Sequence, residues 1–512
     1  MLSHFASHPA GSRLHPGFDA VTASGRGVIA HGKIDELVFA HLARAGVAPA
    51  ALSSDQVFLR RVFLDAIGTL PTALEAQAFL ASNDPQRRTV LIEQLLQRDE
   101  FFVYWAMKWS DLLRIKAEFP INLWPTAAQE YYRWLRESLQ KNKPYDQFAH
   151  ELLTSSGSNF RVGPVNFYRA LQNREPQSLA QAVALAFMGV RTEKWPAARR
   201  AEMAVFFSQV GYKPTGEWKE EIVFYDRSKP PASTEAVFPD GTRTRLEAGH
   251  DPRVEFADWL IGSRNPYFAC NIVNRIWAWL YGRGIIDEPD DIRPDNPPLY
   301  PDLLVFLKAE LVASGYDLKH IYRLILNSST YQLGSIPRGP TAARDFASYP
   351  LRRLDAEVLI DALSQITGTG EQYSSAVPEP YTIMPNGERA IALPDGSITS
   401  SFLELFGRSP RNTGMESERN NRPTAAQRLH LLNSSQIERR IEQGPALQEI
   451  FRKPDPRAVL TSLYLTILSR YPTEAEMKIA AAYAQSSGLD RRKAVIDVAW
   501  ALINSTEFLY RH

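Results

Sequence analysis

The stretch EFFVYWAMKWSDLLRI, residues 100–115, has the pattern of a buried helix. Trp105 and Trp109 lie four residues apart in it. Residues at that spacing share one face of an α-helix, so two large aromatic rings would be buried together. The stretch therefore predicts a core helix of a helical bundle, with the tryptophans as core residues rather than as a platform for a ligand.

Similar apolar periodicity continues on both sides of this stretch. Residues 33–47, KIDELVFAHLARAGV, place one apolar stripe at the three-to-four spacing of a helix. Thr72 and Glu75 have the spacing of a capping box at the start of a further helix. Residues 179–190, LAQAVALAFMGV, predict the most buried helix of this half. No alternation of strands with helices occurs, so the sequence predicts a mainly α protein rather than a parallel α/β sheet.

Two segments interrupt the helical pattern. Residues 220–226, EEIVFYD, alternate and are followed by prolines and an Asp-Gly turn, which predicts a small β-hairpin and a linker. Residues 381–400, YTIMPNGERAIALPDGSITS, predict a second β-like insertion with Asn-Gly and Asp-Gly turns. We therefore predict two helical domains with small β-hairpin insertions, arranged as a disordered N-terminus at residues 1–30, a first helical domain at 31–213, a linker at 214–250 and a second helical domain at 251–512.

Composition excludes several classes of function. The formal net charge of +1 gives no field that favours nucleic acid or an acidic membrane surface, and no apolar run approaches the roughly 20 residues of a membrane span. The single cysteine, Cys270, rules out an intramolecular disulfide and a cysteine-based zinc or iron–sulfur site. We expect Cys270 to be a buried apolar residue, with a catalytic thiol as the alternative. His150, His320 and His430 lie within helical patterns and are expected to be packed, so no metal or cofactor is predicted.

The most charged irregular stretch is FGRSPRNTGMESERNNRP, residues 406–423. Its guanidinium groups could bind carboxylate, sulfate or phosphate in two-point fashion, because each presents a planar fork of donors. Two glutamates in the same stretch could act as acid and base. The alternative is a loop held by an internal network of ion pairs. The candidate residues of this loop are Arg408, Arg411, Arg419, Arg422, Glu416 and Glu418.

A second candidate is NIVNRIWAWLYGRGIIDEPDDIRPDN, residues 271–296. Asn274 and Arg275 lie on one side of the predicted helix, and Asp290 and Asp291 follow in a loop. Adjacent carboxylates near Asn and Arg could bind a cation or a sugar hydroxyl. The alternative is structural, with Arg275 and Asp291 pinning the loop to the helix.

A third candidate is IKAEFPINLWP, residues 115–125, where Glu118 and Asn122 flank a proline break and Trp124 follows. A tryptophan beside polar groups suits stacking of a sugar, and equally suits anchoring of a loop to the core. If the loops at 408–422 and 287–296 converge on one pocket, a substrate site is favoured. If each arginine is paired internally, a structural role is favoured.

Six motifs occur in a specific order: FLRRVFLDAIGTLPT, YWAMKWSDLLRIKAEFPINLWP, NPYFACNIVNRIWAWLYGRGIIDEPDDIRPDNPP, DLKHIYRLILNSSTYQ, RRLDAEVLIDAL and RPTAAQRLHLLNSSQI. In this order they resemble the paired planctomycete cytochrome-c-associated domains, the domains of unknown function 1549 and 1553. The resemblance covers Ile34 to the C-terminus, with the first domain ending near Gly211 and the second beginning near Asp251.

The resemblance implies a location and a biological context. Members of the family are usually exported, and their genes tend to lie beside genes for sulfatase-like proteins and polysaccharide breakdown, although no biochemical activity is established for the family. It therefore implies a periplasmic or secreted protein. The first 27 residues lack the seven-residue apolar core of a secretory signal, so a misplaced start codon or a cytoplasmic member are the alternatives.

Many members carry a c-type haem motif, C-x-x-C-H, just before a helix that ends in MAVFF. This sequence has FMGVRTEKWPAARRAEMAVFF there, with the haem segment missing at the junction of Glu193 and Lys194. Covalent haem needs two thiols and a histidine, and no histidine lies between His150 and His250. We therefore expect no haem, and electron transfer is disfavoured.

Two hypotheses of function follow. In the first, the protein binds or acts on a sulfated or acidic carbohydrate in polysaccharide utilisation, with the arginine-rich loop holding the anion and a carboxylate transferring a proton. Glycosidase-like chemistry needs two carboxylates, for which we expect Glu416 or Glu418 together with Asp290 or Asp291. In the second, it is a non-catalytic partner or scaffold for a sulfatase-like enzyme, and the charged loop is structural. Whether the protein is an enzyme is left open.

Overall fold

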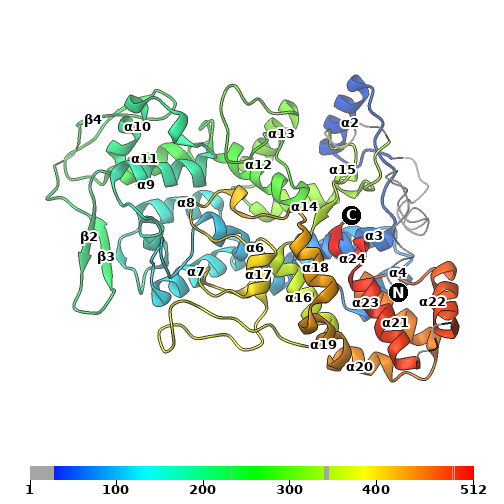
Figure 1. The fold of residues 1–512 in the computed structure, drawn as a ribbon. Coiled ribbons are helices and arrows are strands. Elements are labelled where there is room, and N and C mark those ends of the chain that lie inside the picture. Colours follow the sequence, from blue (N-terminus) through cyan, green and yellow to red (C-terminus); the bar gives the residue numbers. More distant parts are fainter. Residues whose placement is uncertain (1–27, 231, 339–344, 487, 489) are drawn as a thin grey trace.

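The computed structural model describes residues 28–512 except 231, 339–344, 487 and 489. The described chain is mainly helical with small antiparallel sheets, as the sequence predicts (Figure 1). The predicted disordered segment, residues 1–30, lies almost entirely outside the described residues.

Two helices of the first half begin at a residue whose side chain caps them. Ser54 caps the helix from Asp55 by accepting a hydrogen bond from the Val57 backbone, and Thr72 with Glu75 forms the predicted capping box. These helices are α2 (Lys33–Ala45), α3 (Asp55–Ala66), α4 (Ala73–Ala81), α5 (Arg87–Gln97), α6 (Asp99–Leu112), α7 (Pro125–Gln140), α8 (Tyr145–Thr154), α9 (Pro176–Val183) and α10 (Ala197–Ala204).

The second half is again helical, and three of its helices start with an aspartate cap followed by proline or leucine. Its elements are α11 (Pro252–Ile261), α12 (Phe268–Tyr281), α13 (Pro301–Ala313), α14 (Leu318–Asn327), α15 (Ser329–Gln332), α16 (Ala356–Thr367), α17 (Ser401–Leu405), α18 (Ala425–Asn433), α19 (Ser435–Gln443), α20 (Pro445–Phe451), α21 (Pro456–Leu468), α22 (Glu474–Ser486), α23 (Arg491–Ile503) and α24 (Thr506–Leu509).

In the described part of the chain, the strands form three small antiparallel sheets. β1 (Gly157–Ser158), β3 (Glu221–Tyr225) and β2 (Val210–Pro214) lie in that order, with Val210 opposite Tyr225. β4 (Glu235–Val237) pairs with β5 (Arg243–Arg245), and β6 (Arg352–Arg353) with β7 (Tyr510–Arg511). The alternating segment at 220–226 is thus a strand, as predicted.

The prediction of a second β-hairpin insertion, at residues 381–400, is wrong. The segment is irregular, with a 3-10 turn at Ala390–Ala392 and an isolated bridge between Ser374 and Thr399. Its Asn-Gly and Asp-Gly turns are real bends, but turn residues alone do not supply a second strand to pair with.

The core is continuous through both halves of the chain. α6 runs through the centre of the molecule (Figure 1). The indole of Trp279, on α12, lies 5.5 Å from the ring of Trp105 and 5.8 Å from that of Trp109, both on α6. The two tryptophans of the opening stretch are therefore core residues, as predicted, and they contact a third from the distant half.

The C-terminal segment of the chain is hydrogen-bonded to α3, near the start of the first helical half. The Arg60 guanidinium on α3 donates hydrogen bonds to the carbonyls of Ile467 and Phe508, at 2.8 and 2.9 Å. Arg61 donates to the His512 carbonyl at 2.8 Å. In Figure 1 the blue helix α3 accordingly lies beside the red helix α24.

Candidate functional site

The charged loop, residues 406–423, folds back on itself after α17. The Asn420 N–H donates to the Gly407 carbonyl at 2.9 Å. Gly407 has a φ of +85°, and a Cβ at this position would lie 1.9 Å from the Asn420 carbonyl oxygen. Only glycine permits this close approach, so the two ends of the loop are fixed against each other.

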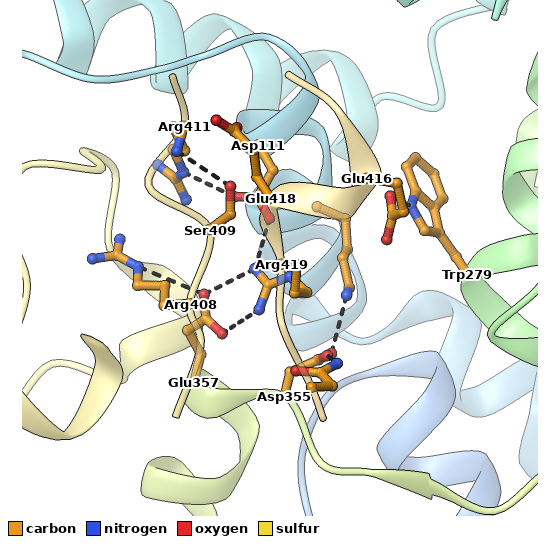
Figure 2. A network of polar contacts seen from close by, with 12 residues as sticks. Asp111, Trp279, Asp355, Glu357, Arg408, Ser409, Arg411, Glu416, Glu418 and Arg419 are labelled. Atoms are coloured by element: carbon orange, nitrogen blue, oxygen red, sulfur yellow. Dashed lines mark hydrogen bonds and ion pairs between the residues drawn. The ribbon is translucent and has the colours of Figure 1, made fainter. Parts of the chain in front are cut away.

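Arg419 joins the loop to the two helices beneath it. Its guanidinium donates to both carboxylate oxygens of Glu357 on α16, at 2.6 and 3.0 Å, and to Asp111 on α6 at 2.6 Å (Figure 2). Burial by itself would raise the pKa of Asp111, but the Arg419 and Arg411 guanidinium groups hold it below the usual range. This arginine therefore serves as a buried link between α6, α16 and the loop.

The other two arginines in this part of the loop are also turned inward. Arg411 is fully buried, and its Nε donates to Asp111 at 3.0 Å. The Arg408 Nε lies 3.6 Å from Glu357, and its two terminal nitrogens donate to the carbonyls of Ile398 and Asp395. Figure 2 shows Arg408, Arg411 and Arg419 converging on the carboxylates of Asp111 and Glu357.

The two loop glutamates hold backbone and indole N–H groups. Glu418 accepts from the backbone N–H groups of Asn412 and Thr413, at 3.2 and 2.9 Å, and burial raises the pKa of Glu418. The Glu416 carboxylate accepts from the Trp279 indole at 2.9 Å. Glu416 and Glu418 thus stabilise the shape of the loop.

The Asp290 loop meets the charged loop through one hydrogen bond. The Glu416 backbone N–H donates to Asp290 at 2.7 Å. Asp290 also accepts from Arg275 of α12 at 2.6 Å, and each of these two side chains is 1% exposed. The predicted pinning of the loop to the helix occurs, but its acidic partner is Asp290 and not Asp291.

The remaining residues of the second candidate lie apart from that contact. The Asn274 side chain donates to the Ile286 carbonyl and accepts from the Ile286 N–H, at 2.9 and 2.8 Å. Asp291 pairs with Lys194 at 3.0 Å and with Arg293 at 3.1 Å. Lys194, in the first half of the chain, thus contacts the second half.

A polar cavity of about 320 Å³ opens beside Arg408. Its walls carry two basic and two acidic groups together with several hydroxyl groups. They include Lys116, Glu118, Ser374, Ser397, Thr399, Glu404, Arg408 and Ser409. Of these residues, only Arg408 and Glu118 belong to the candidates predicted from the sequence.

A surplus of positive charge lies behind the wall of this cavity. In the described part of the chain, the buried cluster joins three guanidinium groups to two carboxylates, those of Arg408, Arg411, Arg419, Asp111 and Glu357. Burial and the neighbouring Arg411 lower the pKa of Arg408 to about 10. Among the described residues, the Arg408 Nε has no hydrogen-bond partner. Arg408 thus has the longest carboxylate contact of the three arginines, and it is the one that lines the cavity.

Trp124 lies in a cluster of three aromatic rings. Its ring centroid is 4.7 Å from that of Trp218 and 5.2 Å from that of Tyr381. A cavity of about 600 Å³ adjoins Trp218 and is lined by Asn122 and Lys219 among others. The third candidate segment therefore contributes Glu118 to one cavity and Asn122 to the other.

Sequence reasoning missed both carboxylates that hold the arginines. Asp111 and Glu357 lie in strongly apolar helical patterns, WSDLL and LDAEVLI. A lone acidic residue on an otherwise buried helix face is a usable signal, because a buried carboxylate requires a cationic or N–H partner.

Cys270 is packed in the core, as predicted, whereas the His150 side chain is 37% exposed and lies 3.4 Å from Asp258. Cys270 is buried, and burial raises the pKa of its thiol to about 11. The ring of His320 lies 2.9 Å from a Glu310 oxygen, and that of His430 packs against Phe402. The described residues contain no group of three or more His, Cys, Asp or Glu side chains placed to hold a metal ion.

Among the described residues, none of the helices has both the length and the apolar character that crossing a membrane requires. No curated protein and no solved structure matches the chain. Two family profiles do match. Residues 33–198 match PSCyt2, a protein of unknown function (DUF1549), and residues 252–484 match PSD1, a protein of unknown function (DUF1553). The chain therefore belongs to the PSCyt2/PSD1 family.

Proposed function

We propose that the protein binds an acidic or sulfated saccharide in the polar cavity beside Arg408. The observation that carries this proposal is that Arg408 lines the cavity and belongs to a buried cluster of three guanidinium groups and two carboxylates. Burying a charge without full compensation is costly. A sulfate or carboxylate in the cavity would offset the positive charge of this cluster, since guanidinium groups attract such anions.

The rest of the cavity wall suits a sugar. The hydroxyl groups of Ser374, Ser397 and Thr399 can each donate and accept a hydrogen bond. Lys116, whose ammonium lies 3.8 Å from the Glu118 carboxylate, is the other basic group of the wall. A small number of placed polar groups is the usual means of fixing a ligand's orientation. This lining favours a ligand with several hydroxyl groups, while the preference for a negative charge rests on the buried arginine cluster behind Arg408.

Two carboxylates line the same cavity, which makes them candidates for acid and base. Glu118 comes from the segment between α6 and α7, and Glu404 from α17. Glycosidic bond cleavage commonly uses two carboxylates on either side of the bond. Glu416, Glu418 and Asp290 hold parts of the fold in place instead. We therefore propose Glu118 and Glu404 for proton transfer, and the test is product analysis with Glu404→Gln.

Calorimetry of the purified protein with sulfated, uronic and neutral saccharides tests the binding. We expect sulfated or uronic fragments to bind and neutral ones of the same length to bind at least about tenfold more weakly, since one charge-assisted contact is worth about 1.5–3 kcal/mol. Lys116→Met should weaken binding without unfolding the protein. Arg422→Gln is the matched control, because Arg422 is an exposed arginine of the same loop.

Two results would contradict the proposal. One is equal affinity for charged and neutral saccharides. The other is an affinity for charged saccharides that is the same in the wild type and in Lys116→Met. Thermal unfolding of each variant shows whether a lost affinity reflects a lost fold.

A second candidate function is a scaffold for a sulfatase-like enzyme. The inward pairing of Arg411 and Arg419 supports it, because both groups hold the loop rather than face a ligand. Mixing the protein with a purified sulfatase-like enzyme from the same source, followed by analytical ultracentrifugation, tests it. A complex that survives Lys116→Met would favour this function over saccharide binding.

A further inference from the structure

The cluster of Trp124, Trp218 and Tyr381 is unusually exposed for three large rings in contact. Trp218 is 60% exposed and Tyr381 is 49% exposed, whereas their centroids are only 5.4 Å apart. The rings come from three distant segments: the start of α7, the turn between β2 and β3, and the irregular segment after α16. Large apolar groups gathered at a surface typically mark a binding site.

The backbone around this cluster is held in a costly conformation. Asn122, Trp124 and Lys219 have φ values of +59°, +75° and +66°. Residues other than glycine rarely adopt this region, and such strain persists where the surrounding structure holds it in place, commonly at binding sites. This backbone geometry orients Trp124, which belongs to the cluster, and Lys219, which lies beside it.

Polar groups adjoin the rings on one side. The cavity of about 600 Å³ includes Trp218 in its wall, together with three basic and three acidic side chains, those of Arg169, Arg174, Lys219, Glu217, Glu220 and Glu221. The Lys219 ammonium lies 5.5 Å from the Trp124 ring centroid and 5.8 Å from that of Trp218. Because the charges balance, this site has no surplus that would favour a polyanion such as nucleic acid.

Exposed aromatic faces beside balanced hydrogen-bonding groups suit a sugar ring. One face of a sugar ring is lined by C–H groups and can pack on an aromatic face, while its hydroxyl groups reach the polar wall. A flat apolar ligand would leave the polar wall unused. A peptide strand would need a free sheet edge, and the cluster lies at the turn of the β2–β3 hairpin and not along an edge.

The cluster lies close to the polar cavity along the chain. Glu118 lines the first cavity and Asn122 the second. Four residues of extended chain span at most about 14 Å, so one segment carries residues of both walls within the length of a short oligosaccharide.

We infer that Trp124, Trp218 and Tyr381 form a stacking subsite for a second sugar of the saccharide whose anionic unit occupies the polar cavity. The inference rests on the proposed function and makes the ligand an oligosaccharide rather than a monosaccharide. Trp218 supplies the exposed face and Lys219 an ammonium donor, and Trp124 packs edge-on against Trp218.

Calorimetry with chondroitin sulfate fragments tests this inference. The wild type should bind the hexasaccharide about tenfold more tightly than the disaccharide, because only the longer fragment reaches the rings. Trp218→Ala should bind the disaccharide as the wild type does and should lose this gain with length. Tyr471→Ala is the matched control, since Tyr471 is 40% exposed and lies outside the cluster.

The outcomes separate the two proposals. A gain with length that persists in both Trp218→Ala and Tyr381→Ala overturns the stacking subsite and leaves the proposed function standing. If no chondroitin sulfate fragment binds, but neutral xylohexaose binds and Trp218→Ala abolishes it, the anion site fails and the stacking subsite stands. If neither charged nor neutral fragments bind the wild type, both proposals fail.

Discussion

The Glu357 carboxylate accepts two hydrogen bonds from the Arg419 guanidinium, at 2.6 and 3.0 Å, in surroundings where Glu357 is fully buried. Glu357 lies on α16 and Arg419 in the charged loop. Asp111 on α6 binds the same guanidinium, so one arginine connects both halves of the chain. The charge of this loop is thus chiefly used to hold the loop, and Arg408 is the member that also lines a cavity.

Replacing Arg419 by methionine should destabilise the protein strongly. The change leaves Glu357 and part of Asp111 buried without their partner, and breaking one side of a buried pair costs about 3–5 kcal/mol. Urea unfolding should show this loss in the free energy of unfolding. Arg422→Met, in the same loop but exposed, should change it by less than about 0.5 kcal/mol.

The double variant Glu357→Gln with Arg419→Met should be more stable than Arg419→Met alone, because it removes the unpaired charge. If Arg419→Met alone were as stable as the wild type, the structural role assigned to the Arg419–Glu357 pair would be contradicted.

Asp361 should make stability depend on pH between about pH 4 and 6. Burial raises the pKa of Asp361 to about 6, against about 3.9 in an unfolded chain. In this window the folded protein holds a proton that the unfolded chain has released. The free energy of unfolding should therefore fall as pH rises, by up to about 3 kcal/mol from this group.

Asp361→Asn removes this titration and tests the prediction. The variant keeps an oxygen that can accept from the Ala390 N–H, which Asp361 holds at 2.6 Å. Relative to the wild type, the variant should gain stability as pH rises from about 4 to 7. Curves of unfolding free energy against pH that run parallel for the two proteins would contradict it.

Cys270 should be inert toward thiol reagents in the folded protein. It is buried, and its pKa of about 11 leaves little thiolate at neutral pH. Iodoacetamide should label it at a negligible rate in buffer and completely in concentrated urea. Fast labelling of the folded protein at neutral pH would instead favour the catalytic thiol that the sequence leaves as an alternative.

Asn274→Ala should cost about 2–4 kcal/mol of stability. The side chain exchanges two hydrogen bonds with the Ile286 backbone and is fully buried, so its loss leaves both backbone groups unpaired and opens a small cavity. Asn83→Ala, at an exposed position, is the matched control. Equal unfolding midpoints for the two variants would show that the contact contributes nothing.

Much of the fold follows from local patterns. The spacing of Trp105 and Trp109 predicts a core helix, and the spacing of Thr72 and Glu75 predicts a capped helix start; both are present. These predictions succeed because helix faces and caps involve residues within a few positions of each other. The hairpin predicted at 381–400 is wrong because its turn residues fix bends, while a strand also needs a partner edge.

The candidate site, too, is determined partly by local sequence and partly by contacts between distant segments. The sequence by itself determines that the chain is mainly helical, that it carries the family's motifs, and that residues 406–423 are an irregular loop rich in charge. Only the tertiary structure decides what that charge does. Arg419 binds Glu357, which is 62 positions away in the sequence, and Asp111, which is 308 positions away. Trp124 likewise contacts Trp218 and Tyr381, which come from separate segments. Periodicity determines which face of a helix is buried, but the partner of a buried charge depends on which distant segments the packed core brings together.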